Sequence, residues 1–248
     1  MTVHFETLHP ATLYPDAFGV EAPDTPVNRD LWPRQLGVFI RKLAVDAPAP
    51  EVAPSAVDGS TDEGVAEVAA EGVVAPPPLA LERVVGQFGL VPRWVKSASD
   101  AKLRSPKLVN ARSETVTTSN NLREAWLAGQ RCIVPMMAFF EDDLRSGKAV
   151  PTRIARVDGK PMGVAGLWER WTGADGAEII SFTLLTVNAN AHALMHRYQQ
   201  PGAEKRMPAI LNEGGYSAWL NAGHPEKARE FLRAYPANWL LANPVQKK

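Results

Sequence analysis

The chain has 248 residues, of which 45% are hydrophobic and 22% charged, and its 27 basic residues balance its 27 acidic ones. This length can bury a sizeable core, and the apolar fraction is that of a globular protein. No run approaches the roughly 20 apolar residues that cross a bilayer, and the start lacks a basic and apolar leader, so we expect a cytoplasmic protein with no membrane partner. The single cysteine, Cys132, excludes an internal disulfide and a cysteine-based zinc site.

The balanced charge is unevenly distributed along the chain. The stretch 46–80 has no lysine or arginine and contains seven acidic residues, namely Asp46, Glu51, Asp58, Asp62, Glu63, Glu67 and Glu71. It is rich in alanine and proline and has no aromatic residue, so it cannot bury enough apolar surface to offset the entropy of ordering. We therefore expect a mobile insertion at 46–80 within a single domain spanning 1–248. The rest of the chain has 27 basic and 20 acidic residues, which either favours a polyanionic partner or marks an ordinary, mildly basic surface.

Hydrophobic patterns predict short strands on both sides of the insertion. Residues 36–43 alternate like a half-buried strand, 82–92 form a strand that ends at a proline, and 131–141 is a continuous apolar strand. Residues 163–171 and 180–187 predict two more strands, which the turn sequence GADGAE joins.

Helical patterns follow at three places. In 119–129, Asn121 with Glu124 resembles a capping box and Gly129 a C-terminal stop. The other two predicted helices cover 188–198 and 226–235. The sequence thus predicts a mixed, strand-rich α+β domain with a curled, largely antiparallel, barrel-like sheet and flanking helices.

Four sequence blocks occur in the order typical of one known family. They are FGLVPRW (88–94), NARSET (110–115), RCIVPMMAFFE (131–141) with GLWERW (166–171), and LLTVNAN (184–190) leading to KRMPAIL (205–211). Together they resemble the SOS response-associated peptidase (SRAP) family of abasic-site processing proteins. The resemblance implies a single domain that binds single-stranded DNA at abasic sites during the SOS response to DNA damage. In the family reaction, the α-amine of a cysteine at position 2 attacks the sugar aldehyde, and its thiol closes a ring that links protein and DNA covalently.

The resemblance also implies roles for individual residues. Asn110 matches the asparagine that holds the N-terminal group and the sugar, and Glu141 matches the catalytic acid. Arg112 matches an arginine that contacts phosphate, for which its planar, two-pronged donor is well suited. Four further residues are implied to contact DNA: Pro92 and Trp94 in a base-stacking loop, Arg93 in the basic stretch 93–112, and His4 at the position of a family arginine. The basic stretch could equally be an exposed loop with no ligand.

Two positions depart from the family pattern. Thr2 stands in place of the cysteine, and the histidine two residues before the RMP arginine is replaced, with Gln199, Glu204 and His196 as candidate substitutes. If Met1 is removed, the Thr2 amine can form a Schiff base, but a hydroxyl should close a less stable ring than a thiol and leave a lyase outcome open. Alternatively, Thr2 is an ordinary residue in a frayed terminus, or the true start lies upstream.

Several residues, and the function itself, are compatible with two interpretations of the sequence. Glu141 is either buried, with a raised pKa suited to acid–base catalysis, or marks the point where a strand reaches solvent. His192 and His196, one helical turn apart, either share a metal or simply pack, and we expect neither a metal nor a cofactor.

The function is either covalent capture of abasic DNA by a monomer, or non-catalytic single-strand binding by a regulatory module of the same fold. A third hypothesis, a peptidase or hydrolase that uses Cys132, conflicts with the apolar run around this thiol.

Overall fold

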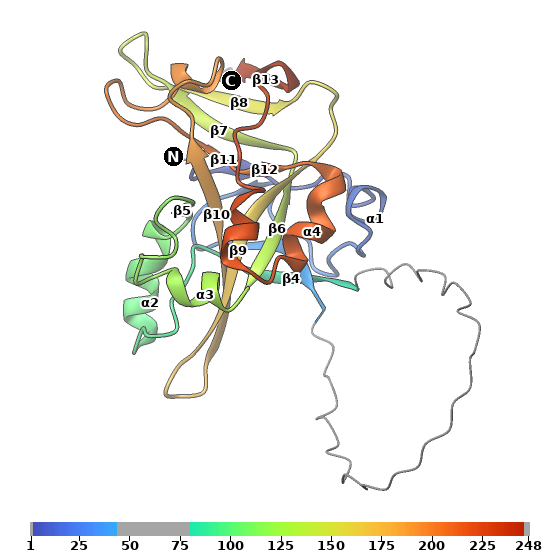
Figure 1. Cartoon of the computed structure of the whole chain (residues 1–248), viewed down its shortest axis with the longest axis vertical. Helices are drawn as coiled ribbons and strands as arrows, with labels where there is room; N and C mark the ends of the chain where they lie inside the picture. The colour runs from blue at the N-terminus through green and yellow to red at the C-terminus, as the bar shows by residue number, and fades with distance from the viewer. Residues whose placement is uncertain (1, 44–79, 246–248) are drawn as a thin grey trace, which may run out of the picture.

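The computed structural model describes residues 2–43 and 80–245. The predicted insertion at 46–80 therefore lies outside the described residues, apart from Ala80. In the described part, thirteen strands form two sheets, and short helices lie around them (Figure 1). No helix in this part is long and apolar enough to cross a membrane.

Five strands close into a barrel. In order around the ring they are β3 (Leu36–Lys42), β4 (Leu81–Phe88), β10 (Glu178–Asn188), β9 (Met162–Thr172) and β6 (Arg131–Met136), which pairs again with β3. Every pairing is antiparallel except that of β10 with β4. The predicted α+β fold with a largely antiparallel, barrel-like sheet is confirmed, as is the predicted hairpin of β9 and β10.

Short strands extend the barrel at one end of β10. The strand β5 (Asn110–Arg112) runs parallel to β10, and β11 (Arg206–Pro208) runs antiparallel to it. Both meet β10 at Thr186, which is the register partner of Arg112 in β5 and of Pro208 in β11. A third short strand, β12 (Ile210–Leu211), pairs with β9. The long β10 thus lies between two of the family-like sequence blocks, NARSET and KRMPAIL.

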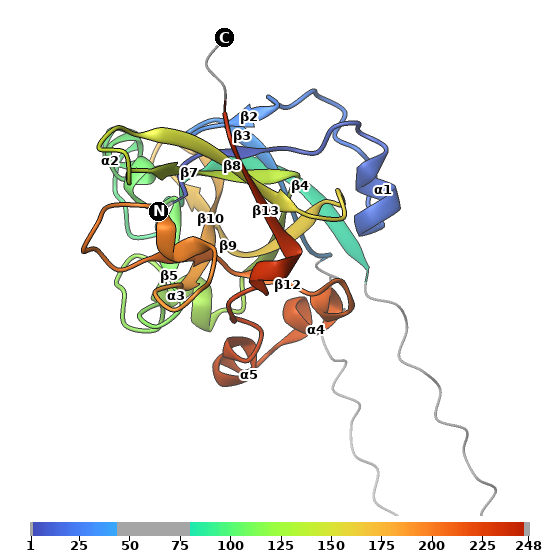
Figure 2. The same ribbon diagram turned by 90° about the horizontal axis from the view of Figure 1, so that it is seen from above.

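The second sheet is antiparallel and lies across one end of the barrel (Figures 1 and 2). Its order is β13 (Leu240–Pro244), β8 (Val150–Arg156), β7 (Ala138–Asp143), β1 (Phe5–Glu6) and β2 (Asp30–Leu31). The apolar run 131–141 was predicted as one strand, but it is two: it leaves the barrel after β6 and enters the second sheet as β7. Between them, the Met137 N–H donates to the Glu6 carbonyl. This crossing brings the end of β7 to the start of the chain.

The helices are short and differ partly from prediction. They are α1 (Leu13–Phe18), α2 (Ala98–Arg104), α3 (Arg123–Leu127), α4 (Tyr216–Asn221) and α5 (Pro225–Arg229), with 3-10 turns η1 (Ser105–Lys107), η2 (Met195–Arg197), η3 (Glu213–Gly215) and η4 (Ala237–Trp239). The helix predicted within 119–129 is present as α3. The predicted capping box of Asn121 and Glu124 is wrong, because Leu122 is the N-cap and makes no side-chain cap bond. Gly129 has a φ of 70°, as expected of a glycine after a helix end.

The helix predicted at 188–198 is wrong. Only the 3-10 turn η2 forms there, and the two asparagine side chains bond to the backbone: Asn188 accepts from the Asn190 N–H, and Asn190 accepts from the Lys205 N–H. The helix predicted at 226–235 is reduced to α5, which ends at Arg229.

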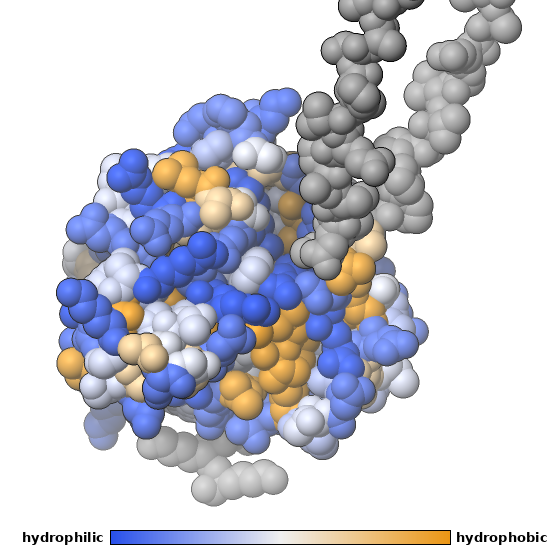
Figure 3. Space-filling model, turned by 90° about the horizontal axis from the view of Figure 1, so that it is seen from below, coloured by the Kyte–Doolittle hydropathy of each residue, from blue (hydrophilic) through white to orange (hydrophobic). Residues whose placement is uncertain are grey.

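The core fills the barrel with aromatic and aliphatic side chains. Phe182 is fully buried between Phe39 and Phe88, with ring centroids 5.5 Å from each. Seen from below, the surface is mostly hydrophilic, with a strip of apolar side chains among polar ones (Figure 3).

Candidate functional site

Thr2 is buried at the start of the chain, three residues before β1. Its hydroxyl donates a 2.6 Å hydrogen bond to Oε1 of Glu141 in β7. Its carbonyl accepts a 2.6 Å hydrogen bond from Nδ2 of Asn110 in β5. The fold thus brings together three residues that the resemblance implied, and Thr2, with 1% of its surface exposed, is no frayed terminal residue.

The carboxyl of Glu141 is enclosed rather than solvated. Burial raises the pKa of Glu141 above its ordinary value of 4.5, and hydrogen bonds from Thr2 and Gln199 oppose that rise. The interpretation in which the strand reaches solvent at Glu141 is therefore wrong, since exposure begins only at the next residue, Asp142. A raised pKa makes a carboxyl a better candidate for general acid–base catalysis than an ordinary surface carboxylate.

Gln199 connects Glu141 to the neighbouring strand. Its side chain makes two hydrogen bonds to the backbone of Arg206, donating to the carbonyl at 2.7 Å and accepting from the N–H at 3.2 Å. Its own backbone has a φ of 65°, in the left-handed region that few side chains adopt, and its N–H donates to the Asp142 carbonyl. This residue is therefore fixed from three sides next to the Glu141 carboxyl.

Asn110 has one buried atom with no partner among the described residues. Its Nδ2 is used by the Thr2 carbonyl, but its Oδ1 has no hydrogen-bond partner there. A buried polar atom without a partner costs about 1–3 kcal/mol, so an acceptor left in this state beside Thr2 favours a ligand or amine donor.

Arg112 and Glu204 form an ion pair at the rim of the site. Arg112 Nη1 donates to Glu204 Oε2 at 2.7 Å, and Glu204 Oε1 accepts from Arg206 at 2.7 Å and from Asn188 at 3.0 Å. The hydrogen bond from Arg206, then that from Asn188 and the charges of the two arginines, lower the pKa of Glu204, so its carboxylate is charged at neutral pH.

Arg206 is the buried centre of this network, a role that the sequence did not reveal. Only 2% of its side chain is exposed, and it donates to both carboxylate oxygens of Glu114, at 3.1 and 2.8 Å. It also donates to the carbonyl of Thr186 at 2.6 Å. Glu114 and Arg206 belong to the NARSET and KRMPAIL blocks, so their presence in both family-like blocks was the available signal.

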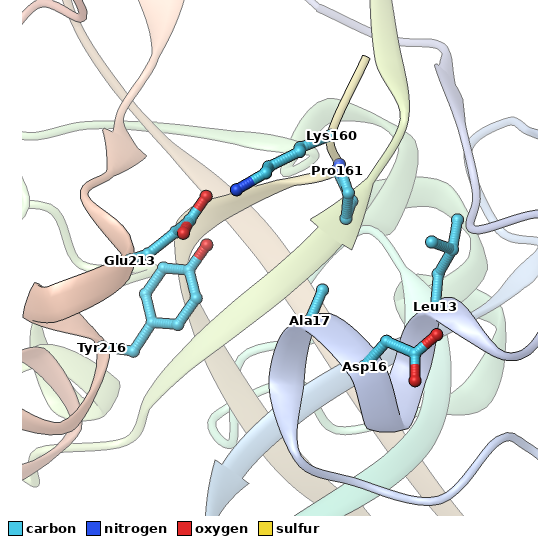
Figure 4. Close-up of a pocket in the computed structure, with 7 residues that line it drawn as sticks. All are labelled: Leu13, Asp16, Ala17, Lys160, Pro161, Glu213 and Tyr216. Carbon is cyan, nitrogen blue, oxygen red and sulfur yellow. The ribbon is translucent and has the colours of Figure 1, made fainter. Parts of the chain in front are cut away.

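A pocket opens beside these residues. It has a volume of about 350 Å³. The polar and charged side chains that line it include Arg112, Glu141, Gln199, Glu204 and Arg206. A second hollow lies elsewhere, between α1 and the residues around Tyr216 (Figure 4). Burial raises the pKa of Tyr216 to about 12, so its phenol stays protonated at neutral pH, and no residue of the Thr2 cluster lines this hollow.

The predicted base-stacking loop precedes α2. Pro92 is buried, whereas Trp94 is 40% exposed and donates its indole N–H to the Asn120 carbonyl. The Arg104 guanidinium lies 4.7 Å from the Trp94 ring centroid. Arg93 is half-exposed and donates to the buried carboxylate of Glu169 at 2.6 Å. Trp94 thus offers an aromatic surface next to basic side chains.

The predicted histidines and the cysteine lie outside the Thr2 cluster. His4 stacks between Trp32 and Phe140, with ring centroids 4.1 and 4.0 Å away, and its Nε2 lies 2.8 Å from an Asp30 oxygen. His196 is exposed, and its Nδ1 lies 2.9 Å from the His192 carbonyl.

The described residues do not support His192 and His196 as a pair of metal ligands, or Cys132 as a nucleophile. His192 Nδ1 accepts backbone N–H bonds from Leu194 and Met195, and no group of three or more metal-ligating side chains occurs in residues 2–43 and 80–245. Cys132 is fully buried, which raises the pKa of its thiol well above the ordinary value, so it is no accessible nucleophile.

Comparison with known proteins identifies related sequences and structures. The family model of the SOS response associated peptidase (SRAP) matches residues 61–248. The abasic site processing protein YoqW of Bacillus subtilis is 31% identical over 162 residues, which cover 64% of this chain and 67% of YoqW. The abasic site processing protein HMCES of Gallus gallus is 25% identical over 179 residues, covering 64% of this chain and 51% of HMCES. A crystal structure of a Bordetella bronchiseptica protein, 36% identical, superposes with a TM-score of 0.79 over 99% of this chain and 100% of that one.

Proposed function

Because this chain belongs to the SRAP family, we propose that it binds single-stranded DNA at abasic sites and captures the sugar aldehyde through the Thr2 amine. The observation that carries the proposal is the buried cluster around Thr2. Its hydroxyl donates to Glu141 and its carbonyl accepts from Asn110, in two hydrogen bonds that are each 2.6 Å long. The names of its relatives, abasic site processing proteins, support a DNA-damage role, which we place in the SOS response and the cytoplasm.

The chemistry begins with removal of Met1, by self-cleavage or by another peptidase, which frees the α-amine of Thr2. This amine has an ordinary pKa near 8, so a useful fraction is neutral at physiological pH. Its lone pair forms a bond to the aldehyde carbon while the carbonyl electron pair moves to oxygen. Glu141 passes two protons, one after the other, from the nitrogen to that oxygen. The oxygen then leaves as water with its bonding electron pair, and the nitrogen lone pair completes the C=N bond.

Three further groups support this reaction. Nδ2 of Asn110 holds the Thr2 carbonyl, and its unpartnered Oδ1 accepts a hydrogen bond from the amine or from a sugar hydroxyl. Gln199 substitutes for the family histidine by fixing the orientation of the Glu141 carboxyl. Arg112 at the rim of the pocket binds a flanking phosphate.

The fate of the imine distinguishes this chain from relatives with a cysteine at position 2. The Thr2 hydroxyl can add to the imine carbon, but oxygen closes a less stable ring than sulfur. The imine therefore persists reversibly or undergoes β-elimination, in which the neighbouring carbon loses a proton and the 3′ phosphate leaves with its bonding electron pair. We accordingly propose lyase-type processing rather than a durable crosslink.

Binding and trapping of DNA test this proposal. Labelled single strands with one abasic site, or with none, are titrated with the protein and treated with cyanoborohydride. We expect salt-sensitive binding of both strands and a trapped adduct with the abasic strand only. Binding without a trapped adduct would favour the non-catalytic single-strand binding module, and absence of binding would refute both functions.

A further inference from the structure

We propose, on the basis of the function above, that Glu204 is an internal substitute for a DNA phosphate, which occupies Arg112 until a bound strand displaces it. The carboxylate and the phosphate group present similar oxygen acceptors to a guanidinium. In the structure, the acceptor at Arg112 Nη1 is Glu204 Oε2, at 2.7 Å. A strand therefore gains this arginine only by exchanging one anion for another.

Glu204 is held in this position rather than left to move freely on the surface. Its other oxygen accepts from Arg206 at 2.7 Å and from Asn188 at 3.0 Å. Only 2% of the Arg206 side chain is exposed, so it is a rigid anchor. The fixed carboxylate presents its remaining oxygen to Arg112 at little further entropic cost.

Arg206 has partners other than Glu204, which leaves the Glu204 carboxylate available for a role at Arg112. Arg206 already has a two-point ion pair with Glu114 and hydrogen bonds to Thr186. Glutamine at position 204 would keep an oxygen acceptor for Arg206 and Asn188. It would lose the negative charge and the second oxygen acceptor that compete for Arg112.

The pair is also open to an incoming strand. The Arg112 side chain is 48% exposed and that of Glu204 31%, and both line the pocket that contains Glu141. A phosphate beside an abasic sugar in this pocket would approach Arg112 and meet the Glu204 carboxylate. The competition weakens binding of every strand, intact or damaged, and thereby limits occupancy on undamaged DNA.

The test compares affinities of Glu204→Gln and the wild-type protein for an intact single strand by fluorescence anisotropy at low salt. We expect Glu204→Gln to bind about three- to tenfold more tightly, with the gain shrinking as salt rises. The matched control is Glu213→Gln, which also removes a carboxylate paired with an arginine at 2.7 Å, Arg156, but away from the pocket. We expect it to change affinity less than about twofold.

A second comparison separates competition at Arg112 from a general effect of charge. In an Arg112→Ala background, Glu204→Gln should tighten binding less than about twofold, because the contact at issue no longer exists. An equal gain in both backgrounds, or unchanged or weaker binding by Glu204→Gln alone, would overturn the inference while leaving DNA binding by the wild type intact. If neither wild type nor variant binds any strand, the proposed function fails as well.

Discussion

Thr2 and Glu141 lie 139 residues apart in the chain, yet their side chains share a buried 2.6 Å hydrogen bond. The start of the chain and the end of β7 meet because β1 pairs with β7, with Phe5 opposite Phe139. The pairing fixes a terminal residue, which would otherwise fray, against a carboxyl whose pKa is raised by burial. The proposed chemistry follows from this one contact.

Substitution of Thr2 tests whether sulfur decides the fate of the adduct. We predict that Thr2→Cys forms an abasic-DNA adduct that survives heat and detergent without a reductant, because a thiol can close the stable ring. Denaturing gel electrophoresis after mixing with abasic single-stranded DNA measures the adduct.

The matched control is Thr2→Ser, which keeps the hydroxyl and should need cyanoborohydride, as we expect of the wild type. Durable adducts from the wild-type protein and from Thr2→Ser would contradict the view that oxygen cannot replace sulfur here.

Neutralising Glu141 should change stability and reactivity in opposite directions. Since burial raises its pKa, the folded state favours the protonated carboxyl. Its stabilising contribution is complete below the ordinary value of 4.5 and is lost as pH rises through the folded-state pKa. We therefore predict that Glu141→Gln melts a few degrees above wild type at pH 7, while the adduct forms about 100-fold more slowly or worse.

Melting curves by circular dichroism between pH 4 and pH 8 measure the first effect, and the two proteins should converge toward pH 4. Glu178→Gln, which removes a half-exposed carboxylate at the start of β10, should show no such convergence. A Glu141→Gln protein that is less stable than wild type at pH 7 would show that the carboxylate form is favoured.

Arg206 should matter more for folding than any surface arginine. Removing one partner of a buried ion pair typically costs about 3–5 kcal/mol, because the other charges lose their partner. We predict a loss of this size in the free energy of unfolding for Arg206→Met, which leaves the buried network around Glu114 and Glu204 without its cation.

Urea unfolding with wild type and Arg145→Met provides the comparison. The Arg145 side chain is 62% exposed and pairs with nearby Asp143, so its loss should cost less than about 1 kcal/mol. Equal losses in the two variants would refute the central role of Arg206.

Trp94 should contribute base stacking to strand binding. Stacking of one base on an aromatic side chain is worth about 1–3 kcal/mol, so Trp94→Ala should weaken single-strand binding by at least about fivefold. Anisotropy titrations measure this, with Trp239→Ala as control, because Trp239 is similarly exposed but lies next to β13. Equal effects of both substitutions would assign no particular role to Trp94.

The strands of the barrel were predictable because their patterns are local. Residues 36–43, 163–171 and 180–187 each have enough apolar positions to specify a strand on their own. The strands β5 and β11 have only three residues each and exist because β10 pairs with them. No local pattern specifies such elements.

The composition of the site was predictable only in part, and for the same reason. The resemblance singled out Thr2, Asn110 and Glu141, and their roles there remain proposals, although the fold does bring them together. The pairing of Arg112 with Glu204, 92 residues away, depends on how β5 and β11 flank β10. Sequence patterns do not encode such a contact, and they also wrongly predicted a helix at 188–198, where only η2 forms.

The most direct test of the proposed chemistry is to locate the covalent bond. Intact mass first establishes whether Met1 is absent, and the protein is then trapped with cyanoborohydride on abasic single-stranded DNA, digested and sequenced by mass spectrometry. We predict that the sugar remnant is attached to the α-amine of Thr2. A remnant on a lysine, or no adduct on protein whose Thr2 amine is free, would contradict capture by this amine.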